Sequence, residues 1–291
     1  MAPRAVDEFP LHRIVDPASG EGLRARALIV HGYAEHAGRY QALAAEWNAA
    51  GIETHRIDLP GHGDAPGMRV LVRDAARCVR DLVGMLEEVQ GDGPTALFGH
   101  SFGGALALRV AQERPDLLDA VAVTAPFLES ALPEPLWRVR LAAFAARIAP
   151  TVRTKRLDAR GVSRDPDQVR AYDDDPRVDR GGVRLATARE LFAIGPRVLA
   201  DAAAPLPPAL LVHGEADAIA HVRGTRRFAE VASARPGADV TVRIVPGGAH
   251  ALLHDEGRET TVRQVTDWVR ERLGLGSSGD VVSARSGSGA P

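Results

Sequence analysis

The chain reads Thr95-Ala96-Leu97-Phe98-Gly99-His100-Ser101-Phe102-Gly103-Gly104 at the point that decides its fold. The apolar run 96–98 predicts a buried strand, and the apolar pattern of 105–111 predicts a helix. The pattern Gly-x-Ser-x-Gly centred on Ser101 is therefore confined to a sharp turn between strand and helix. Such a turn strains its central residue, and the flanking glycines let strand and helix approach without Cβ clashes. The sequence predicts a serine hydroxyl held out at the carboxyl end of a strand.

Strands and helices alternate along most of the remaining chain. The run 27–30 is apolar throughout, which is typical of a strand covered on both faces. This alternation implies right-handed crossovers, so we expect an α/β fold with a mostly parallel sheet flanked by helices. The expected strands are 11–15, 26–31, 52–57, 96–98, 120–124, 209–212 and 240–245, and the expected helices are 38–50, 72–89, 105–111, 222–232 and 262–269.

The alternation breaks after Pro126, where prolines cluster and no strand is evident until the sheet resumes. We interpret 127–205 as an inserted helical cap that divides the core into 1–126 and 206–273. The last segment, 274–291, is rich in glycine and serine and lacks the apolar residues needed to offset the entropy of ordering. We expect that tail to be disordered.

The composition is that of a soluble globular protein, with 291 residues, 45% of them apolar and 25% charged. A formal net charge of −2 gives no field that would attract nucleic acid. The single cysteine, Cys78, is expected to be buried on a helix, and one cysteine excludes both an intramolecular disulfide and a zinc-binding cysteine cluster. Neither a signal peptide nor a run as long as a membrane span is evident, so we expect a cytoplasmic protein.

Ser101 needs a base and an acid to act as a nucleophile. A serine hydroxyl attacks only when a histidine removes its proton, and that histidine needs a carboxylate to fix its tautomer and stabilise its cation. Both partners are expected just past strand ends at the same edge of the sheet. His250 follows the strand that ends at Val245, and Asp217 follows the strand that ends at Val212. These two residues are the expected base and acid.

Each of these assignments has an alternative. Glu215 and Asp255 are carboxylates near the same two loops and could supply the acid instead. Asp217 could also serve only as a turn residue, because aspartate is common in turns. His254 lies one helical turn beyond His250. The position just past a strand favours Asp217 and His250, and we interpret most of the other histidines as loop or packing residues.

The negative charge that develops on an attacked carbonyl needs two backbone N–H donors. The residue after the nucleophile, Phe102, opens the helix and is expected to supply one of them. The loop after the strand 27–30 reads His31-Gly32-Tyr33 and is expected to supply the other from Tyr33. We therefore expect an oxyanion hole formed by the backbone of Tyr33 and Phe102.

Six segments carry a family resemblance. They are His31-Gly32-Tyr33-Ala34-Glu35-His36-Ala37-Gly38-Arg39-Tyr40, Asp58-Leu59-Pro60-Gly61-His62-Gly63, Gly99-His100-Ser101-Phe102-Gly103-Gly104, Tyr172-Asp173-Asp174-Asp175-Pro176-Arg177-Val178, Gly214-Glu215-Ala216-Asp217 and Gly248-Ala249-His250. Together they resemble the monoacylglycerol lipase and lysophospholipase group of α/β-hydrolases, over nearly the whole chain except its tail. The resemblance implies the α/β-hydrolase fold, with Ser101 as nucleophile and Asp217 and His250 as acid and base. It also implies Tyr33 and Phe102 as backbone donors, although related enzymes often carry a smaller or apolar residue in place of Tyr33, which affects the expected shape of the acyl pocket.

The resemblance and the site residues together predict hydrolysis of a lipid-like carboxylic ester, a monoacylglycerol or a lysophospholipid, through an acyl-enzyme on Ser101. The expected partner is a small acyl ester, and no metal or organic cofactor is implied. A soluble carboxylesterase and a small-substrate peptidase are alternatives, and so is a non-catalytic ligand-binding protein, because a fold does not fix a function. The motifs leave acyl chain length, head group and oligomeric state open.

Four apolar residues of the expected cap follow helical spacing and form what we call the cap stripe: Trp137, Leu141, Phe144 and Ile148. Three arginines lie along its flanks: Arg138, Arg140 and Arg147. Arginines beside an apolar helix face are typical of lipid-surface binding, which favours a role for the stripe in substrate binding, with the protein peripheral to a membrane. The alternative is a stripe that packs on the core over the active site, as most apolar stripes in soluble proteins do.

Overall fold

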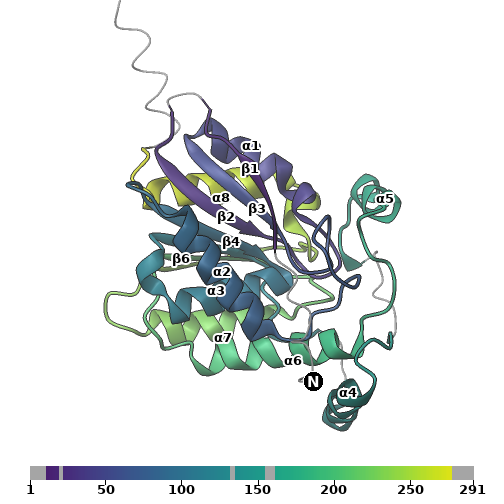
Figure 1. Ribbon diagram of the computed structural model, residues 1–291. Helices are drawn as coiled ribbons and strands as arrows, with labels where there is room; N and C mark the ends of the chain where they lie inside the picture. The colour runs from purple at the N-terminus through teal and green to yellow at the C-terminus, as the bar shows by residue number, and fades with distance from the viewer. Residues whose placement is uncertain (1–10, 20–21, 132–134, 155–160, 277–291) are drawn as a thin grey trace, which may run out of the picture.

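A seven-stranded sheet forms the centre of the molecule (Figure 1). The structure, a computed structural model, describes residues 11–19, 22–131, 135–154 and 161–276. The strands are β1 (His12–Asp16), β2 (Ala25–Val30), β3 (Ile52–Asp58), β4 (Thr95–His100), β5 (Ala120–Thr124), β6 (Ala209–Gly214) and β7 (Val240–Val245). Their order is β1-β3-β2-β4-β5-β6-β7, and every neighbouring pair is parallel except β1 with β3. The expected α/β fold with a mostly parallel sheet is confirmed.

Two layers of helices cover the two faces of the sheet. The helices are α1 (Gln41–Ala49), α2 (Ala75–Val89), α3 (Ser101–Glu113), α4 (Leu136–Ile148), α5 (Pro166–Asp174), α6 (Leu185–Ala200), α7 (Val222–Ser233) and α8 (Arg258–Arg272), with short 3-10 helices at Ala37–Tyr40, Pro115–Leu117 and Leu252–His254. α1 and α8 pack on one face, and α2, α3, α6 and α7 pack on the other (Figure 1). Successive strand residues serve opposite layers, since Leu28 of β2 joins the larger core and Ile29 joins the smaller one.

The helix expected from residue 72 begins only at Ala75. The side chain of Asp74 accepts a hydrogen bond from the backbone N–H of Ala76 at 2.9 Å and so caps α2. Val72 lies in the loop before this cap, where its N–H donates to the hydroxyl of Thr187 in α6 at 2.9 Å. The start of α2 is therefore set by a cap and by a partner distant in the sequence.

Within the segment expected to form the cap, 127–205, α6 packs against the core. β5 and β6 are parallel neighbours, so the chain must cross from the carboxyl end of one to the amino end of the other. α6 makes this crossing, and its residues Leu191, Ile194 and Val198 join the larger core. α4 and α5, by contrast, project beyond the end of the sheet (Figure 1). This packing favours a cap that ends at Arg184.

The core continues slightly past the boundary expected after Leu273. Leu275 is buried in the smaller core, and its N–H donates to the backbone oxygen of Arg270 at 2.9 Å. The rest of the expected tail, 277–291, lies outside the described residues.

The cysteine and the helices bear on two expectations from composition, a buried thiol and a chain without a membrane span. Cys78 of α2 is buried, as expected, and burial raises the pKa of its thiol to about 12. None of the described helices is long and apolar enough to cross a membrane.

Candidate active site

The turn that carries Ser101 joins β4 directly to α3. β4 ends at His100, and Ser101 has a φ of 51°, in the left-handed region that non-glycine residues rarely adopt. The neighbouring glycines are required sterically. A Cβ on Gly99 would lie 2.4 Å from the backbone oxygen of Gly103, and a Cβ on Gly103 would lie 2.3 Å from that of His31. This close packing holds the strained serine at the end of the strand.

His250 and Asp217 meet at the same edge of the sheet. His250 Nδ1 lies 2.7 Å from Asp217 Oδ2, and both residues are buried. The other carboxylate oxygen, Asp217 Oδ1, accepts the backbone N–H groups of Ile219 at 2.8 Å and Ala220 at 2.9 Å. Burial alone would raise the pKa of Asp217, but His250 and the hydrogen bonds hold it far below its usual value. Asp217 is thus an ionised acceptor that orients the His250 ring.

Ser101 and His250 open into one pocket with a volume of about 70 Å³. His100 also lines this pocket, with its ring centroid 4.8 Å from that of His250. Burial lowers the pKa of His100 to about 4, so this ring is neutral near pH 7. Its Nδ1 atom lies 3.1 Å from the backbone oxygen of Thr124, which can only accept, so Nδ1 carries the proton. His100, beside Ser101, therefore forms a neutral part of the pocket wall.

The structure separates the expected acid and base from their alternatives. Glu215 is exposed. Asp255 is buried and accepts the backbone N–H of Ala249 at 2.9 Å, so it braces the loop just before His250. The Nε2 atom of His254 is buried without a hydrogen-bond partner among the described residues. The residues that the structure brings together are those favoured by their positions past strand ends.

A buried carboxylate, which the sequence analysis did not single out, stands behind the expected oxyanion loop. Glu35 Oε1 accepts the N–H of Gly32 and the hydroxyl of Tyr40, each at 2.6 Å, and Oε2 accepts Arg39 Nε at 2.9 Å. Burial opposes ionisation, but Arg39 and Tyr40 are among the groups that hold the pKa of Glu35 far below its usual value. The arginine four residues after Glu35 was the available sequence signal. Because the Gly32 N–H is engaged, the N–H of Tyr33 is the next backbone donor along this loop.

The side chain of Tyr33 forms one wall of the pocket. Its ring lies edge-on to His62 with centroids 5.8 Å apart. Its hydroxyl is buried, without a hydrogen-bond partner in the described part of the chain, and burial raises the pKa of this phenol. Phe102, the other expected backbone donor, is the second residue of α3, and the first N–H groups of a helix have no partner within it.

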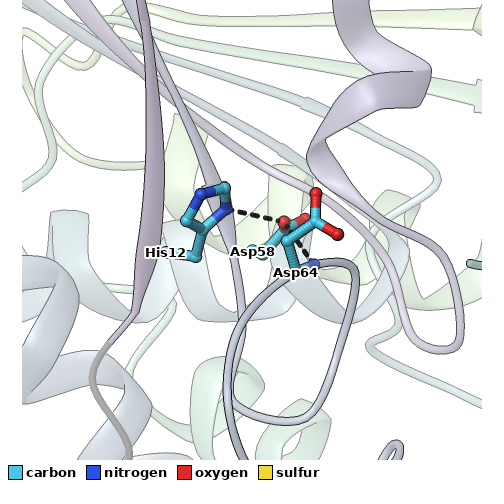
Figure 2. A group of neighbouring side chains, drawn as sticks. All are labelled: His12, Asp58 and Asp64. Atoms are coloured by element: carbon cyan, nitrogen blue, oxygen red, sulfur yellow. Dashed lines mark hydrogen bonds and ion pairs between the residues drawn. The ribbon is translucent and has the colours of Figure 1, made fainter.

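Figure 2 shows the group among the described residues whose side-chain atoms lie within 4.8 Å of one another and so could hold a metal ion: His12, Asp58 and Asp64. Asp58 Oδ1 accepts the N–H of Ala37 at 2.7 Å. Asp58 Oδ2 accepts the N–H of Asp64 at 3.0 Å and lies 3.0 Å from His12 Nδ1. Both oxygens are thus satisfied by the protein. The group ties β1 and the end of β3 to the segment that begins at Ala37, and it needs no ion to do so.

The cap stripe of α4 is exposed to solvent. The exposed fractions are 63% for Trp137, 59% for Leu141, 58% for Phe144 and 74% for Ile148. The alternative in which this stripe packs on the core is therefore wrong, and the four side chains do not line the pocket of Ser101 either. Arg147 is exposed on the same helix, and the side chains of Arg138 and Arg140 lie outside the part that the structure describes.

Comparison with known proteins identifies relatives over most of the chain. The family model described as serine aminopeptidase S33 matches residues 22–257. The monoacylglycerol lipase of Mycolicibacterium smegmatis is 32% identical over 253 residues, which cover 86% of this chain and 89% of that protein. The human monoglyceride lipase is 30% identical over 257 residues, which cover 86% and 83% of the two chains. The crystal structure of Paleococcus ferrophilus monoacylglycerol lipase matches with a TM-score of 0.81 at 30% identity, covering 92% of this chain and 100% of that one.

Proposed function

We propose that this chain, which belongs to the serine aminopeptidase S33 family of α/β-hydrolases, hydrolyses the ester bond of monoacylglycerols and similar lipid esters with Ser101 as nucleophile. The observation that carries the proposal is the 2.7 Å contact between His250 Nδ1 and Asp217 Oδ2, beside the pocket that His250 shares with Ser101. Relatives at 30–32% identity are monoacylglycerol or monoglyceride lipases, which supports the substrate class. As a member of this family with lipase relatives, the chain is a carboxylic ester hydrolase.

In the first stage, His250 removes the hydroxyl proton of Ser101 while Oγ attacks the ester carbonyl. Asp217 fixes the tautomer in which His250 Nδ1 carries a proton, and it stabilises the imidazolium. The carbonyl oxygen becomes an oxyanion that accepts the backbone N–H groups of Tyr33 and Phe102. The intermediate collapses when His250 protonates the leaving oxygen. Glycerol departs and the acyl group stays on Ser101.

In the second stage, water hydrolyses the acyl-enzyme. His250 takes a proton from the water as its oxygen attacks the acyl carbonyl, and the oxyanion occupies the same two backbone donors. His250 then returns the proton to Ser101 Oγ as the fatty acid leaves. Each cycle consumes one ester and one water and restores the starting enzyme.

The walls of the pocket support an amphiphilic substrate. Phe127, Leu191 and Ile219 supply apolar surface, and Glu35 and Tyr172 supply polar groups. An acyl chain gains free energy when it leaves water for apolar walls, whereas the hydroxyl groups of a glycerol head need hydrogen-bond partners. A monoacylglycerol carries an acyl chain on one side of its ester and a glycerol head on the other. The apolar wall therefore suits the chain, and the polar wall suits the head.

A further part of the proposal is that α4 and α5 form a cap through which the protein contacts a lipid surface. The cap stripe exposes four large apolar side chains on one helix, with Arg147 exposed on the same helix. Exposed apolar side chains beside an arginine can enter the acyl boundary of a lipid interface while the guanidinium group stays at the head groups. The stripe residues then bind the acyl chain of the substrate before it enters the pocket.

A fluorophosphonate probe and a substrate panel test this function. We expect the probe to label Ser101 in the wild-type protein and not to label the Ser101→Ala variant. The panel contains monoacylglycerols, lysophospholipids, short aryl esters and aminoacyl anilides, and we expect the highest kcat/KM on monoacylglycerols. A preference for aryl esters would favour a carboxylesterase, and cleavage of the anilides would favour a peptidase. If the probe does not label Ser101, the protein is a non-catalytic binding protein.

A further inference from the structure

His213 is a buried histidine for which the mechanism above gives no role. It lies near the end of β6, and its side chain is fully buried. Its Nε2 atom lies 3.2 Å from Asp217 Oδ2 and 3.0 Å from the backbone oxygen of Ala220. Its Nδ1 atom lies 2.7 Å from Oγ1 of Thr225, in the first turn of α7. The imidazole therefore contacts the acid of the site on one edge and a packed helix on the other.

These contacts fix the tautomer of His213. A backbone carbonyl oxygen can only accept a hydrogen bond, so Nε2 carries a proton that it donates to Ala220, and Asp217 Oδ2 lies 3.2 Å from the same nitrogen. Nδ1 is then the acceptor, and the hydroxyl of Thr225 donates to it. The ring thus presents a donor, and not an acceptor, to the carboxylate.

The Asp217 carboxylate accepts hydrogen bonds on both of its oxygens. Oδ1 accepts the backbone N–H groups of Ile219 and Ala220, and Oδ2 faces His250 Nδ1 and His213 Nε2. Apart from His213, the group that contacts Oδ2 in the described part of the chain is His250, which is the ring that this oxygen must orient. His213 therefore restrains Oδ2 from a side that is independent of His250.

We propose that His213 is a positioning residue for the hydrolytic reaction, in which it donates to Asp217 Oδ2 and holds this oxygen in line with His250 Nδ1. The inference rests on the proposed function, because it assigns His213 to the same site. Thr225 takes part indirectly, since its hydroxyl stabilises the tautomer that can donate. A residue that only fills space would be replaceable by any side chain of similar volume.

Two substitutions of His213 separate donation from packing. Methionine has a similar volume and no donor, whereas the amide nitrogen of glutamine can occupy the position of Nε2. We expect His213→Met to lower kcat for a short aryl ester about 10- to 100-fold with KM unchanged, as for loss of a hydrogen bond to a charged group. We expect His213→Gln to restore kcat to within about threefold of the wild-type value.

A matched pair of threonine substitutions tests the tautomer. Thr225→Val removes the hydroxyl that donates to His213, and we expect it to lower kcat about 3- to 10-fold. Thr266→Val is the control. Thr266 lies on α8, and its buried hydroxyl accepts a hydrogen bond from Trp47 Nε1 at 3.1 Å. Both variants lose a buried hydrogen bond, so both should lose stability, but Thr266→Val should keep the wild-type kcat.

An NMR measurement that needs no substrate separates this inference from the proposed function. The proton between His250 Nδ1 and Asp217 gives a far-downfield resonance in the folded protein whether or not an ester is hydrolysed. We expect this resonance in the wild type, in Ser101→Ala and in His213→Gln. We expect it to broaden or move upfield in His213→Met.

The outcomes are distinguishable. A wild-type protein that shows the resonance but hydrolyses no ester would overturn the proposed function and leave the contact of His213 with Asp217 in place. A folded His213→Met variant with wild-type kcat and resonance would overturn the positioning role. If His213→Met does not fold, Thr225→Val decides the question in the same way, because wild-type kcat and resonance in that variant would also overturn it.

Discussion

Ser101 is held in a backbone conformation that its side chain disfavours. A positive φ on a non-glycine residue costs about 1–3 kcal/mol, and it persists only where the surroundings enforce it. Ala34 in the loop after β2 and Ala125 directly after β5 share this conformation, and so does Val70 in the loop before α2. In return, the Ser101 hydroxyl stands beside the first turn of α3, whose N–H groups favour negative charge. Strain and catalytic position are thus properties of the same residue.

Ser101→Ala should abolish turnover and leave the fold and substrate affinity nearly unchanged. With the nucleophile gone, only substrate binding and the backbone donors contribute, so we expect kcat to fall on the order of 10⁶-fold. His250→Ala should cost about as much and Asp217→Asn less, and combined variants should be little worse, because these residues act as a unit. Steady-state kinetics on a soluble ester measure these effects. A Ser101→Ala variant that keeps about a tenth of the wild-type rate would contradict the assignment.

Tyr33 should limit the length of the acyl chain that the pocket accepts. Its ring occupies one wall of a cavity of about 70 Å³, so Tyr33→Ala enlarges the space beside Ser101. We expect the ratio of kcat/KM for a long-chain ester to that for a short-chain ester to rise about tenfold. Esters of graded chain length measure this ratio.

Tyr33→Phe is the matched control for this change. It keeps the ring, so the chain-length ratio should stay at the wild-type value. It also removes a buried hydroxyl that has no partner among the described residues, so the melting temperature should rise. An equal shift of the ratio in Tyr33→Phe and Tyr33→Ala would mean that the hydroxyl, and not the ring, sets chain length.

At the scale of elements, α4 should govern access to substrate that is held in a lipid surface. Leu141→Ser with Phe144→Ser removes two exposed apolar side chains that would each contribute about 1.5–3 kcal/mol when buried in lipid. We expect the double variant to bind anionic vesicles at least about 30-fold more weakly and to hydrolyse dispersed long-chain monoacylglycerol more slowly. Turnover of a soluble short-chain ester should be unchanged.

Val231→Ser provides the control for the cap stripe. Val231 is an exposed apolar residue on α7, in the layer of helices that covers the sheet. Its substitution should leave vesicle binding and both activities at the wild-type level. Equal losses on the dispersed and the soluble substrate in the Leu141 and Phe144 variant would show that α4 supports the site itself and not a lipid contact.

Elements whose ends depend on local sequence could be predicted, and those set by distant contacts could not. The apolar runs gave β5 and β7 their observed bounds. The start of α2 depends also on Glu190 of α6, whose carboxylate accepts the N–H of Ala75 at 3.0 Å. α6 lies within the expected cap 127–205, because its sequence does not reveal that it crosses from β5 to β6.

The same distinction applies to the site. Ser101, Asp217 and His250 stand just past strand ends, a position that the order of apolar runs reveals. Glu35 and His213 act through partners that only the folded chain brings near, so their spacing in sequence carries little information. The residues proposed to act on the substrate are thus easier to predict than the buried residues that position them.

At the scale of the whole molecule, buried histidines make stability sensitive to acid. Burial lowers the pKa of five of them among the described residues, to about 3 for His62 and His254, to about 4 for His100, and in the same direction for His31 and His55. In the unfolded chain each has a pKa near about 6.5, so each takes up a proton on unfolding at intermediate pH. The contribution of these histidines to the free energy of unfolding is therefore fully present above about pH 6.5 and is lost as the pH decreases towards their folded pKa values.

The free energy of unfolding should fall on acidification, and His62→Gln should make that fall shallower. A buried histidine contributes up to about 1.4 kcal/mol per pH unit between its folded and unfolded pKa values, so the slope should decrease by about that amount. Urea titrations at about pH 7, 6 and 5 give the slope directly. A wild-type slope in His62→Gln would mean that His62 binds its proton equally in both states.

The path between β5 and α6 has a further consequence for how such enzymes diversify. The chain leaves the sheet at β5 and re-enters it at the adjacent β6. Near its start the path is anchored by the N–H of Ala131, which donates to the backbone oxygen of Ile219 at 3.0 Å, and at its end by Arg184 Nε, which donates to the backbone oxygen of Arg69 at 2.7 Å. A segment with fixed ends can be lengthened, shortened or exchanged at an entropic cost that rises slowly with its length. Recombination between relatives, or deliberate grafting, can therefore replace the part that contributes Val162 and Tyr172 to the pocket while the inherited register of the sheet stays intact.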